Sequence, residues 1–308
     1  HSLLQEDIQF KNLGYVIIDE QQRFGVNQRR ILREKGNNPD LLLMTATPIP
    51  RTLAISYYES HDISLIRQKP SNRKEIKSRL IVFSNIEKAF KIIDNDINNG
   101  RQLYVICPLI QETDSNNNIS VEEAYKIIGK RFKTAKTDIL HGRMNDKEKN
   151  SVLTSFYNNE IQILVSTTVV EVGVNVTNAT SMIVFNASNF GLAQLHQLRG
   201  RIGRNDLESH CFFIVDDLAE ENDRLGILEK TNDGFAISEH DLLLRGPGEV
   251  FGNTQSGLPD LVYGNIIRDK ELLDLAFNDA EEVISSKDRN SKLLVTQVLK
   301  SIDSYNFD

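Results

Sequence analysis

The feature that most constrains the fold of this chain is a regular alternation of short apolar runs with longer amphipathic stretches. Between residues 80 and 215, runs of strand length alternate with segments whose apolar residues recur at helical spacing. Parallel strands are joined through helical crossovers, so this order predicts a parallel α/β sheet. The expected strands are residues 80–83, 103–106, 138–140, 161–165, 181–185 and 211–215, and the expected helices are 85–98, 121–132, a helix capped by Asn145 with Glu148, and 190–201.

Two further strand-like runs precede this region. Residues 15–18 and 41–44 are continuously apolar, which is typical of parallel strands covered by helices on both faces. The first run ends in Asp19-Glu20 and the second in Thr45-Ala46-Thr47. Because open α/β sheets bind ligands beyond the carboxyl ends of their strands, these polar residues are candidates for a site.

The chain divides into three parts, which we place at residues 1–75, 76–217 and 218–308. A polar stretch at 68–77 is expected to connect the first two parts. After residue 218 the strand-like runs stop. Helical segments follow at 218–230, at 237–244 and from 269, with a glycine-rich loop at 246–257 and a polar final segment that we expect to fray.

The charge distribution restricts how the chain can hold phosphate. The net charge of −7 argues mildly against a nucleic-acid-binding protein, because such proteins are usually basic. The acidity is concentrated in residues 221–308, with 9 Lys and Arg against 17 Asp and Glu, whereas residues 1–80 have 13 against 9. Contacts to phosphate must therefore come from main-chain amides and a few placed side chains.

The cysteines and the apolar runs exclude other classes. Cys107 and Cys211 each fall in an apolar run without metal-ligand spacing, so we interpret both as buried thiols of a reducing compartment. The apolar runs are far shorter than the roughly 18 residues of a membrane helix, so we expect no membrane span.

The acid pair Asp19-Glu20 is the first candidate for chemistry. Phosphoryl-transfer ATPases hold Mg²⁺ with an acid after a strand and orient the attacking water with a neighbour. An acid pair alone is more often a solvated strand end, so the interpretation depends on its surroundings. One such feature is the segment 45–52, where two prolines follow a strand for no obvious packing reason.

The sharpest signal is the segment 197–204, which reads Gln-Leu-Arg-Gly-Arg-Ile-Gly-Arg. Three arginines within six residues, spaced by glycines, are poor core material. Guanidinium groups bind phosphate through paired hydrogen bonds and stabilise charge during γ-phosphoryl transfer. We therefore favour a phosphate-binding role over a solvated helix end.

Two other segments are less specific. In residues 167–175, Thr168 offers a hydroxyl and Gly173 allows close main-chain approach to phosphate, but an ordinary polar loop explains the pattern equally well. In residues 140–144, His141 is most simply a hydrogen-bonded turn residue without a catalytic role.

Taken together, these segments resemble the motifs of superfamily 2 helicases, in the version found in the RecG family. Segment 19–25 resembles motif II, 45–52 motif III, 167–175 motif V and 197–204 motif VI. Segment 241–259 resembles the RecG translocation motif, a helical hairpin followed by a glycine-rich loop. The resemblance covers nearly the whole chain. One departure is Gln22, where the family usually has histidine.

The resemblance implies an α/β fold of two RecA-like parallel-sheet domains, the first truncated, with a small helical C-terminal module. It implies ATP hydrolysis with Mg²⁺: Asp19 binds the metal and Glu20 orients the water. Arg201 and Arg204 reach the γ-phosphate from the second domain. The other implied nucleotide contacts are Gln22, Thr45, Thr47, Glu171, Gly173 and Gln197. The implied residues for DNA binding and translocation are Arg51, His141, Arg143, Thr168, Arg245 and Gln255.

The implied activity is that of an ATP-dependent double-stranded DNA translocase and helicase. Such an enzyme remodels branched DNA, including stalled forks and Holliday junctions, in repair and recombination. The resemblance further implies a bacterial cytoplasmic, nucleoid-associated protein whose parent is monomeric and does not bind membranes. Single-strand DNA-binding protein is a candidate partner.

One motif is missing from the sequence, and alternatives stay open. There is no G-x-x-x-x-G-K-[ST] segment, so we expect the phosphate loop to lie upstream and the 308-residue chain alone to be inactive. The transcription-repair coupling factor is the near alternative, against which Pro247, Glu249 and Leu258-Pro259 argue. A non-catalytic module that binds DNA or a partner is the other alternative, although it has no need for the acids and arginines. Exposed sheet edges in residues 1–75 could drive dimerisation.

Overall fold

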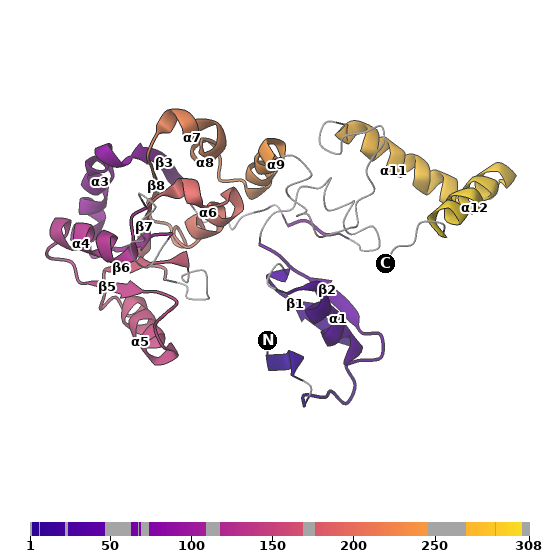
Figure 1. Ribbon diagram of the computed structural model, residues 1–308, viewed down its shortest axis with the longest axis horizontal. Helices are drawn as coiled ribbons and strands as arrows, with labels where there is room; N and C mark the ends of the chain where they lie inside the picture. The colour runs from indigo at the N-terminus through magenta and orange to yellow at the C-terminus, as the bar shows by residue number, and fades with distance from the viewer. Residues whose placement is uncertain are drawn as a thin grey trace. The chain divides into compact units, whose positions relative to one another are not determined.

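A six-stranded parallel sheet forms the core of the largest part of the chain (Figure 1). The computed structural model describes residues 2–5, 7–21, 24–46, 63–66, 68, 74–108, 118–168, 176–245, 269–286 and 288–303. The strand order is β3-β8-β7-β4-β6-β5, which confirms the expected α/β class. The strands are β3 Ile76–Val82, β4 Gln102–Ile106, β5 Thr137–Leu140, β6 Ile163–Ser166, β7 Ala179–Val184 and β8 Ser209–Val215.

The start of β3 differs from the expectation. The polar composition predicts a connection that includes residues 76 and 77, but Ile76 already pairs with Ser209 and Lys77 with His210 in the parallel ladder. The Ile76 side chain is buried. The connection therefore ends before residue 76, because burial of one isoleucine and pairing with β8 outweigh the polar composition around it.

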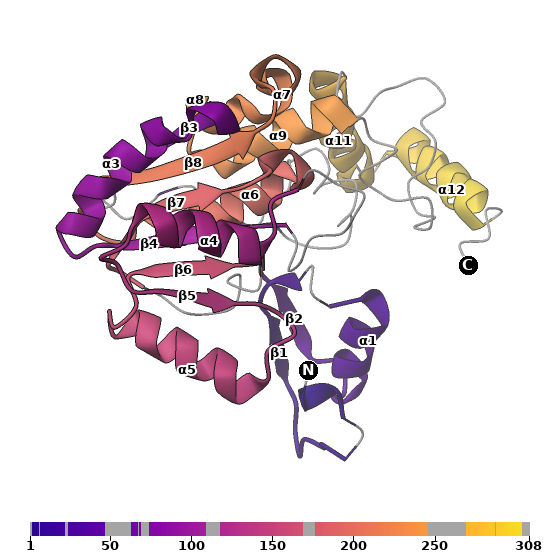
Figure 2. The same cartoon turned by 60° about the vertical axis from the view of Figure 1, so that its left-hand side comes forward.

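Helices cover both faces of this sheet (Figure 2). Along β4, Leu103 and Val105 join the core beneath α3 and α4, whereas Tyr104 and Ile106 join the core beneath α5 and α6. Alternate side chains of a strand point to opposite faces, so a strand buried on both faces is apolar throughout. The helices are α3 Glu87–Asn98, α4 Val121–Arg131, α5 Asp146–Tyr157, α6 Leu192–Arg199, α7 Leu218–Leu225 and α8 Ile227–Lys230, with short 3₁₀ segments η3 Phe83–Asn85 and η5 Ala187–Asn189.

The predicted cap of α5 is confirmed. The Glu148 amide donates to Asn145 Oδ1 at 2.9 Å, and the Asn145 amide donates to Glu148 Oε2 at 3.0 Å. This reciprocal pair satisfies two amides that the first turn leaves without helical partners. Ser120 and Glu123 form the same capping box on α4.

A separate two-stranded parallel sheet lies in residues 1–48. Its elements are η1 Ser2–Leu4, β1 Tyr15–Ile18, α1 Val26–Glu34 and β2 Asp40–Leu43. Val16 and Ile18 pack with Leu32 of α1, but Tyr15 is 52% exposed and Ile17 is 56% exposed. The expectation that this strand is buried on both faces is therefore wrong for this chain. In the described part, α1 covers one face and leaves the other face open.

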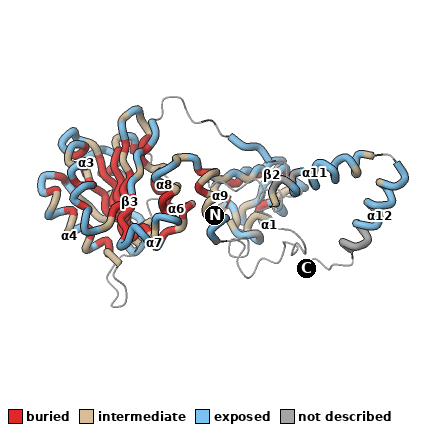
Figure 3. The backbone as a smooth tube through the Cα atoms, turned by 90° about the horizontal axis from the view of Figure 1, so that it is seen from above, coloured by how far each residue is buried: buried red, intermediate tan, exposed pale blue. Residues whose placement is uncertain are grey.

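In the described part of the C-terminal region, the helices are α9 Gly234–Arg245, α11 Lys270–Ser285 and α12 Arg289–Asp303. The last of these corrects the expected frayed end. Asp288 caps α12 by accepting hydrogen bonds from the amides of Asn290 at 2.6 Å and Ser291 at 3.1 Å. The hydroxyls of Ser291 and Ser286 also donate to its carboxylate, and these hydroxyl bonds, followed by the amide bonds, lower its pKa. Buried residues concentrate in the six-stranded sheet, whereas α11 and α12 are mostly exposed (Figure 3).

Contacts divide the chain into two units. The first contains residues 1–48 and 69–237, and the second contains 49–68 and 238–308. Helix α9 begins in the first unit at Gly234 and ends in the second unit at Arg245. Across the described ranges, no helix is long and apolar enough to cross a membrane.

Candidate nucleotide and DNA site

The predicted acids stand directly after β1. The Glu20 amide donates to Asp19 Oδ1 at 2.8 Å, and Glu20 has a φ of 50°. A left-handed main chain is uncommon for a residue with a side chain and is often found at functional sites. The acid pair therefore occupies a sharp turn at a strand end.

The structure brings Thr45 to the same place. The Met44 amide donates to the Ile18 carbonyl at 2.8 Å, and the Gln21 amide donates to the Met44 carbonyl at 3.1 Å. These bonds continue the pairing of β1 and β2 past their ends. Thr45, Asp19 and Glu20 thus cluster at one sheet edge, as expected from parallel neighbours.

The arginine segment forms a tight turn at residues 200–204, directly after α6, which we call the arginine turn. The Arg201 amide donates to the Leu198 carbonyl at 2.9 Å, and Arg204 Nε donates to the Gly200 carbonyl at 3.2 Å. Ile202 is fully buried and anchors the turn. Arg201 and Arg204 themselves are half-buried.

Gly203 is required by this turn. Its φ is 64°, and a Cβ atom there would lie 2.8 Å from Cγ1 of Ile76. Either fact alone disfavours a side chain. Gly203 therefore allows the turn to pack against the first residue of β3.

The first arginine of the segment, Arg199, has a different environment. Arg199 is 1% exposed, and its Nη1 donates to the carbonyls of Leu228 at 2.8 Å and Thr231 at 3.0 Å. The interpretation of all three arginines as poor core material is therefore wrong for Arg199. Burial is possible because helix-end carbonyls accept its hydrogen bonds, and burial also lowers its pKa.

Gln197 lies one helical turn before Arg201 and is half-buried on α6. Gln197 is in the last turn of α6, directly before the arginine turn. Tyr104 on β4 lies within electrostatic range of the same turn. Burial raises the pKa of Tyr104 to about 12, while the charges of Arg201 and Arg204 act in the opposite direction.

A second group lies at the carboxyl ends of β5 and β6. The Thr167 amide donates to the Leu140 carbonyl at 3.3 Å, which places His141 beside Thr167 and Thr168. Thr168 is half-buried and Arg143 is exposed. Nδ1 of His141 is buried and has no hydrogen-bond partner among the residues that the structure describes.

The arginine turn and the group of His141 and Thr168 lie at opposite ends of the parallel strands. The arginine turn packs at Gly203 against Ile76 and Ser209, the first residues of β3 and β8, whereas His141 and Thr168 follow strand ends. Arg245 ends α9, and its side chain is outside the described set. The remaining predicted residues also lie outside the described residues: Gln22, Thr47, Arg51, Glu171, Gly173 and Gln255.

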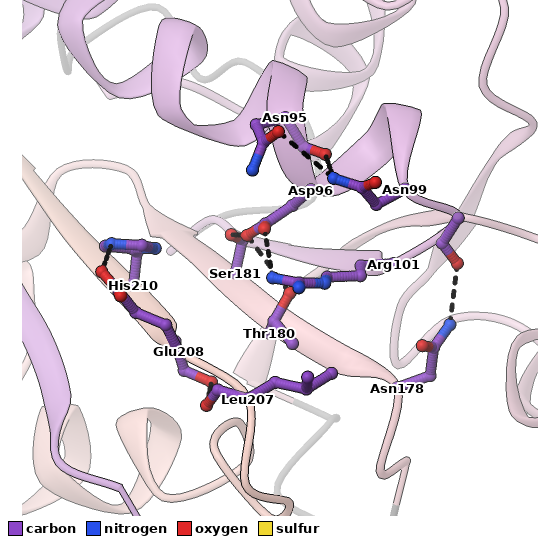
Figure 4. Close-up of polar contacts among 12 residues, drawn as sticks. Asn95, Asp96, Asn99, Arg101, Asn178, Thr180, Ser181, Leu207, Glu208 and His210 are labelled. Carbon is purple, nitrogen blue, oxygen red and sulfur yellow. Dashed lines mark hydrogen bonds and ion pairs between the residues drawn. The ribbon is translucent and has the colours of Figure 1, made fainter.

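Sequence reasoning missed a polar cluster at the amino-terminal ends of β7 and β8 (Figure 4). The buried Asp96 of α3 accepts hydrogen bonds from Arg101 Nη1 at 2.8 Å and Thr180 Oγ1 at 3.2 Å, and also from Ser181. His210 lies nearby and pairs with Glu208 at 3.1 Å. A signal was present, because Asp96 falls on the apolar face of α3 with Phe90 and Ile93.

Both cysteines are buried, as expected. Burial raises the pKa of the Cys211 thiol to about 12 and raises the pKa of Cys107 further. A thiol with so high a pKa is a weak nucleophile at neutral pH. The two cysteines are therefore packing residues.

Two family models match the chain. The helicase conserved C-terminal domain matches residues 82–206, and the C-terminal part of domain 3 of the ATP-dependent DNA helicase RecG matches residues 231–308. The first match runs from the last residue of β3 to just beyond Arg204 and includes the strands β4, β5, β6 and β7. The second covers α9, the glycine-rich loop and the final helices.

Curated relatives agree with these matches. The chain is 48% identical to the ATP-dependent DNA helicase RecG of Staphylococcus epidermidis (strain ATCC 35984) over 288 residues, which is 93% of this chain and 42% of that relative. It is 46% identical to the same-named protein of Staphylococcus aureus (strain NCTC 8325) over the same shares. The chain therefore spans less than half the length of these relatives.

Solved structures show the same fold. A structure of RecG bound to a three-way DNA junction matches with a TM-score of 0.67 and 40% identity, over 89% of this chain and 35% of that chain. Saccharomyces cerevisiae Dbp5 L327V bound to RNA and ADP BeF3 matches with a TM-score of 0.54 at 13% identity, over 79% and 65%. The second similarity concerns the fold alone.

Proposed function

Since this chain belongs to the RecG family of ATP-dependent DNA helicases, whose C-terminal portion it matches, we propose that it is the downstream part of a motor that translocates on double-stranded DNA and remodels branched DNA. The proposal divides the chain at 1–75, 76–217 and 218–308, as the sequence suggests. It also places the protein in the bacterial cytoplasm, at the nucleoid.

The arginine turn carries this proposal. Ile202 and Gly203 fix its main chain, and the residues Arg201 and Arg204 are half-buried. Charge that develops on a transferring phosphoryl group is stabilised best by donors that need no rearrangement. Arginine fingers contribute about 10³–10⁵ in rate in nucleotide hydrolysis. We assign Arg201 and Arg204 to the γ-phosphate of ATP.

The turn at Asp19 and Glu20 supports binding of the metal and activation of the attacking water. Asp19 is exposed after β1 with a carboxylate available to a cation, and oxygen ligands of this kind suit Mg²⁺. Bound Mg²⁺ would neutralise charge on the phosphates. Glu20 would orient the attacking water and accept its proton, and Thr45 would stand beside the phosphates. By family position, the other nucleotide contacts are Gln22, Thr47, Glu171, Gly173 and Gln197.

The DNA surface is assigned to the group beyond β5 and β6. His141, Arg143 and Thr168 offer a ring nitrogen, a guanidinium and a hydroxyl, which suit the phosphate backbone rather than base edges. Arg51, Arg245 and Gln255 are assigned to translocation by family position. The related structure bound to a three-way junction supports branched DNA as the substrate.

The relatives favour this function over the transcription-repair coupling factor. The RecG domain 3 match covers residues 231–308, which include Pro247, Glu249 and Leu258-Pro259. The absence of a G-x-x-x-x-G-K-[ST] segment means that the 308-residue chain alone should not hydrolyse ATP. A longer protein that carries this loop upstream is needed for the activity.

The test is DNA-stimulated ATP hydrolysis by that longer protein, with a four-way junction, a linear duplex or no DNA. We expect strong stimulation by the junction. The Arg204→Ala variant should lose about 10³-fold of the stimulated rate. Arg101→Lys is the matched control, since Arg101 lies in the structural cluster around Asp96, and it should keep the rate. Hydrolysis that ignores DNA, or that survives in Arg204→Ala, would contradict the proposal.

A further inference from the structure

Helix α4 and the loop after it form a strongly basic stretch. Residues 124–137 contain five basic residues and no acidic residue, in a chain whose net charge is −7. Four of the five are the exposed lysines Lys126, Lys130, Lys133 and Lys136. Within the described part of the chain, none of these lysine side chains forms an ion pair or a hydrogen bond. Their positive charges are therefore open to a partner.

The fifth basic residue, Arg131, fixes α4 to α3 on one face of the sheet (Figure 2). Its Nη1 donates to Asp94 Oδ1 at 2.9 Å, and its Nε lies 3.5 Å from Glu87 Oε2. Its guanidinium carbon also lies 5.0 Å from the ring centre of Phe132 and 5.6 Å from that of Phe90. Because the two acids of α3 are paired with Arg131, the lysines stay uncompensated on a surface that two helices hold in place.

The preference of helix ends for cations explains only part of this stretch. Lys130 lies in the last turn of α4, where positive charge is favoured by the helix dipole. Lys126 lies one turn earlier, and Lys133 and Lys136 follow the end of the helix. The dipole acts only within the last turn, so the other three lysines need another explanation.

The spacing of the lysines suits a phosphate backbone. Lys126 and Lys130 share one face of α4 and lie about 6 Å apart along its axis, which is close to the roughly 7 Å covered by two steps of one DNA strand. Tyr125 is 38% exposed beside them, and tyrosine hydroxyls also bind phosphate. At Gly129 a Cβ atom would meet nothing within 4 Å, so the surface between these side chains is open.

The basic stretch leads into β5, which is an edge strand of the six-stranded sheet. Strand β5 begins directly after Lys136 and ends directly before His141. Its four residues span about 13 Å, which corresponds to about four base pairs of duplex DNA. The lysines after α4 and the proposed DNA group at His141 and Arg143 therefore lie at opposite ends of one edge strand, within reach of the same duplex.

We propose that Lys126, Lys130, Lys133 and Lys136 form a lysine face that binds the phosphate backbone of a duplex arm of branched DNA. The lysine face lies outside the segments that resemble helicase motifs, and the inference rests on the proposed function. Lysine ammonium groups on flexible stems supply charge without reading bases. The lysine face should therefore add affinity for duplex of any sequence and leave the hydrolysis step unchanged.

The test is the salt dependence of three-way-junction binding by the longer protein, followed by fluorescence anisotropy. Each phosphate contact adds about 0.9 to the slope of log K against log salt concentration. The double variant Lys126→Gln with Lys130→Gln should lower the magnitude of this slope by about 2 and raise Kd about tenfold at physiological salt. Glutamine has nearly the helix propensity of lysine, so α4 should stay folded. The kcat for hydrolysis at saturating junction should stay within about twofold of the wild type.

The double variant Lys74→Gln with Lys230→Gln is the matched control. Both lysines are exposed, and they lie before β3 and at the end of α8, at the other edge of the sheet. The control makes the same change of charge and should keep the wild-type slope. A second pair, Lys133→Gln with Lys136→Gln, tests the lysine face without any change inside the helix and should lower the slope as the first pair does.

An unchanged slope in both pairs of the lysine face would overturn the inference, and so would an equal fall in the control pair. A poly-glutamate peptide tests the other class of partner. If the peptide binds the wild type but not Lys126→Gln with Lys130→Gln, while both proteins bind the junction alike, the face binds an acidic protein segment and the inference is wrong. A wild-type protein that binds no junction would reject the proposed function instead, which separates the two failures.

Discussion

Glu229 Oε1 on α8 accepts a hydrogen bond of 2.7 Å from the main-chain amide of Leu80 on β3. Strand β3 lies at the edge of the six-stranded sheet, where amides have no strand partner on one side. Unpaired edge amides invite pairing with another chain. The carboxylate of Glu229 therefore protects the edge and attaches α8 to it.

This contact predicts a difference between two substitutions. Glu229→Ala should lower the free energy of unfolding by about 1 kcal/mol, because it leaves the Leu80 amide without its acceptor near solvent. Glu229→Gln keeps an oxygen acceptor and should cost clearly less. Urea titrations followed by circular dichroism compare the two, and equal stability of Glu229→Ala and the wild type would contradict the assigned role.

Gly203→Ala should destabilise the protein by about 2 kcal/mol, because it forces a side chain into a left-handed main chain and toward Ile76. Gly129→Ala on α4 is the control, since a Cβ atom there meets nothing within 4 Å. It should raise stability by up to about 1 kcal/mol through helix propensity. Thermal unfolding distinguishes these outcomes, and a Gly203→Ala variant as stable as the wild type would show that the turn adopts another conformation.

Asp96→Asn should cost about 2 kcal/mol of stability, because Arg101 loses its ionic partner and two hydroxyls lose a charged acceptor. The penalty is below that of a fully buried pair, since the Arg101 side chain is 24% exposed. Asp94→Asn is a milder control, as Asp94 pairs with Arg131 near the surface. The prediction fails if chemical denaturation finds the Asp94 change to be the more costly one.

His210 predicts a dependence of stability on pH. Burial lowers its pKa from the ordinary value of 6.5, although Asp96 and Glu208 act in the opposite direction and Lys77 in the same direction. The unfolded chain then binds a proton at a higher pH than the folded chain does. Stability is therefore fully present above about pH 6.5 and falls as the pH drops toward the lower folded-state pKa.

The His210→Gln variant isolates this contribution. Between pH 7.5 and pH 5.5, the wild type should lose more unfolding free energy than His210→Gln, while the two should respond alike above about pH 7. Denaturant titrations at several pH values measure the difference. Parallel pH profiles of the two proteins across the whole range would exclude the effect.

Much of the fold followed from local sequence. The alternation of apolar runs with amphipathic stretches predicted the parallel sheet, because parallel strands are joined by helical crossovers. The cap at Asn145 and Glu148 was equally local, since both partners lie within one helical turn. The positions of Asp19, Glu20 and Thr45 followed from strand ends that meet at one edge.

Other features depended on residues far apart in the chain. Arg199 and Arg201 have the same side chain and lie two residues apart, yet only Arg199 is buried. Apart from His196 on the same helix, its acceptors come from β3 and from the end of α8, which no local pattern identifies. The exposure of Ile17 likewise depends on which elements cover β1, and its apolar run gave no sign of it.

The sequence by itself thus determined the class of sheet, the order of its elements and the residue types offered to phosphate. Only the tertiary structure decided that Arg199 is buried while Arg201 and Arg204 stay half-buried. It also decided which side chains donate hydrogen bonds to Asp96. The physical reason is that secondary structure is selected by periodicity within a few residues, whereas burial of a charge depends on hydrogen-bond partners that only the folded chain brings within reach.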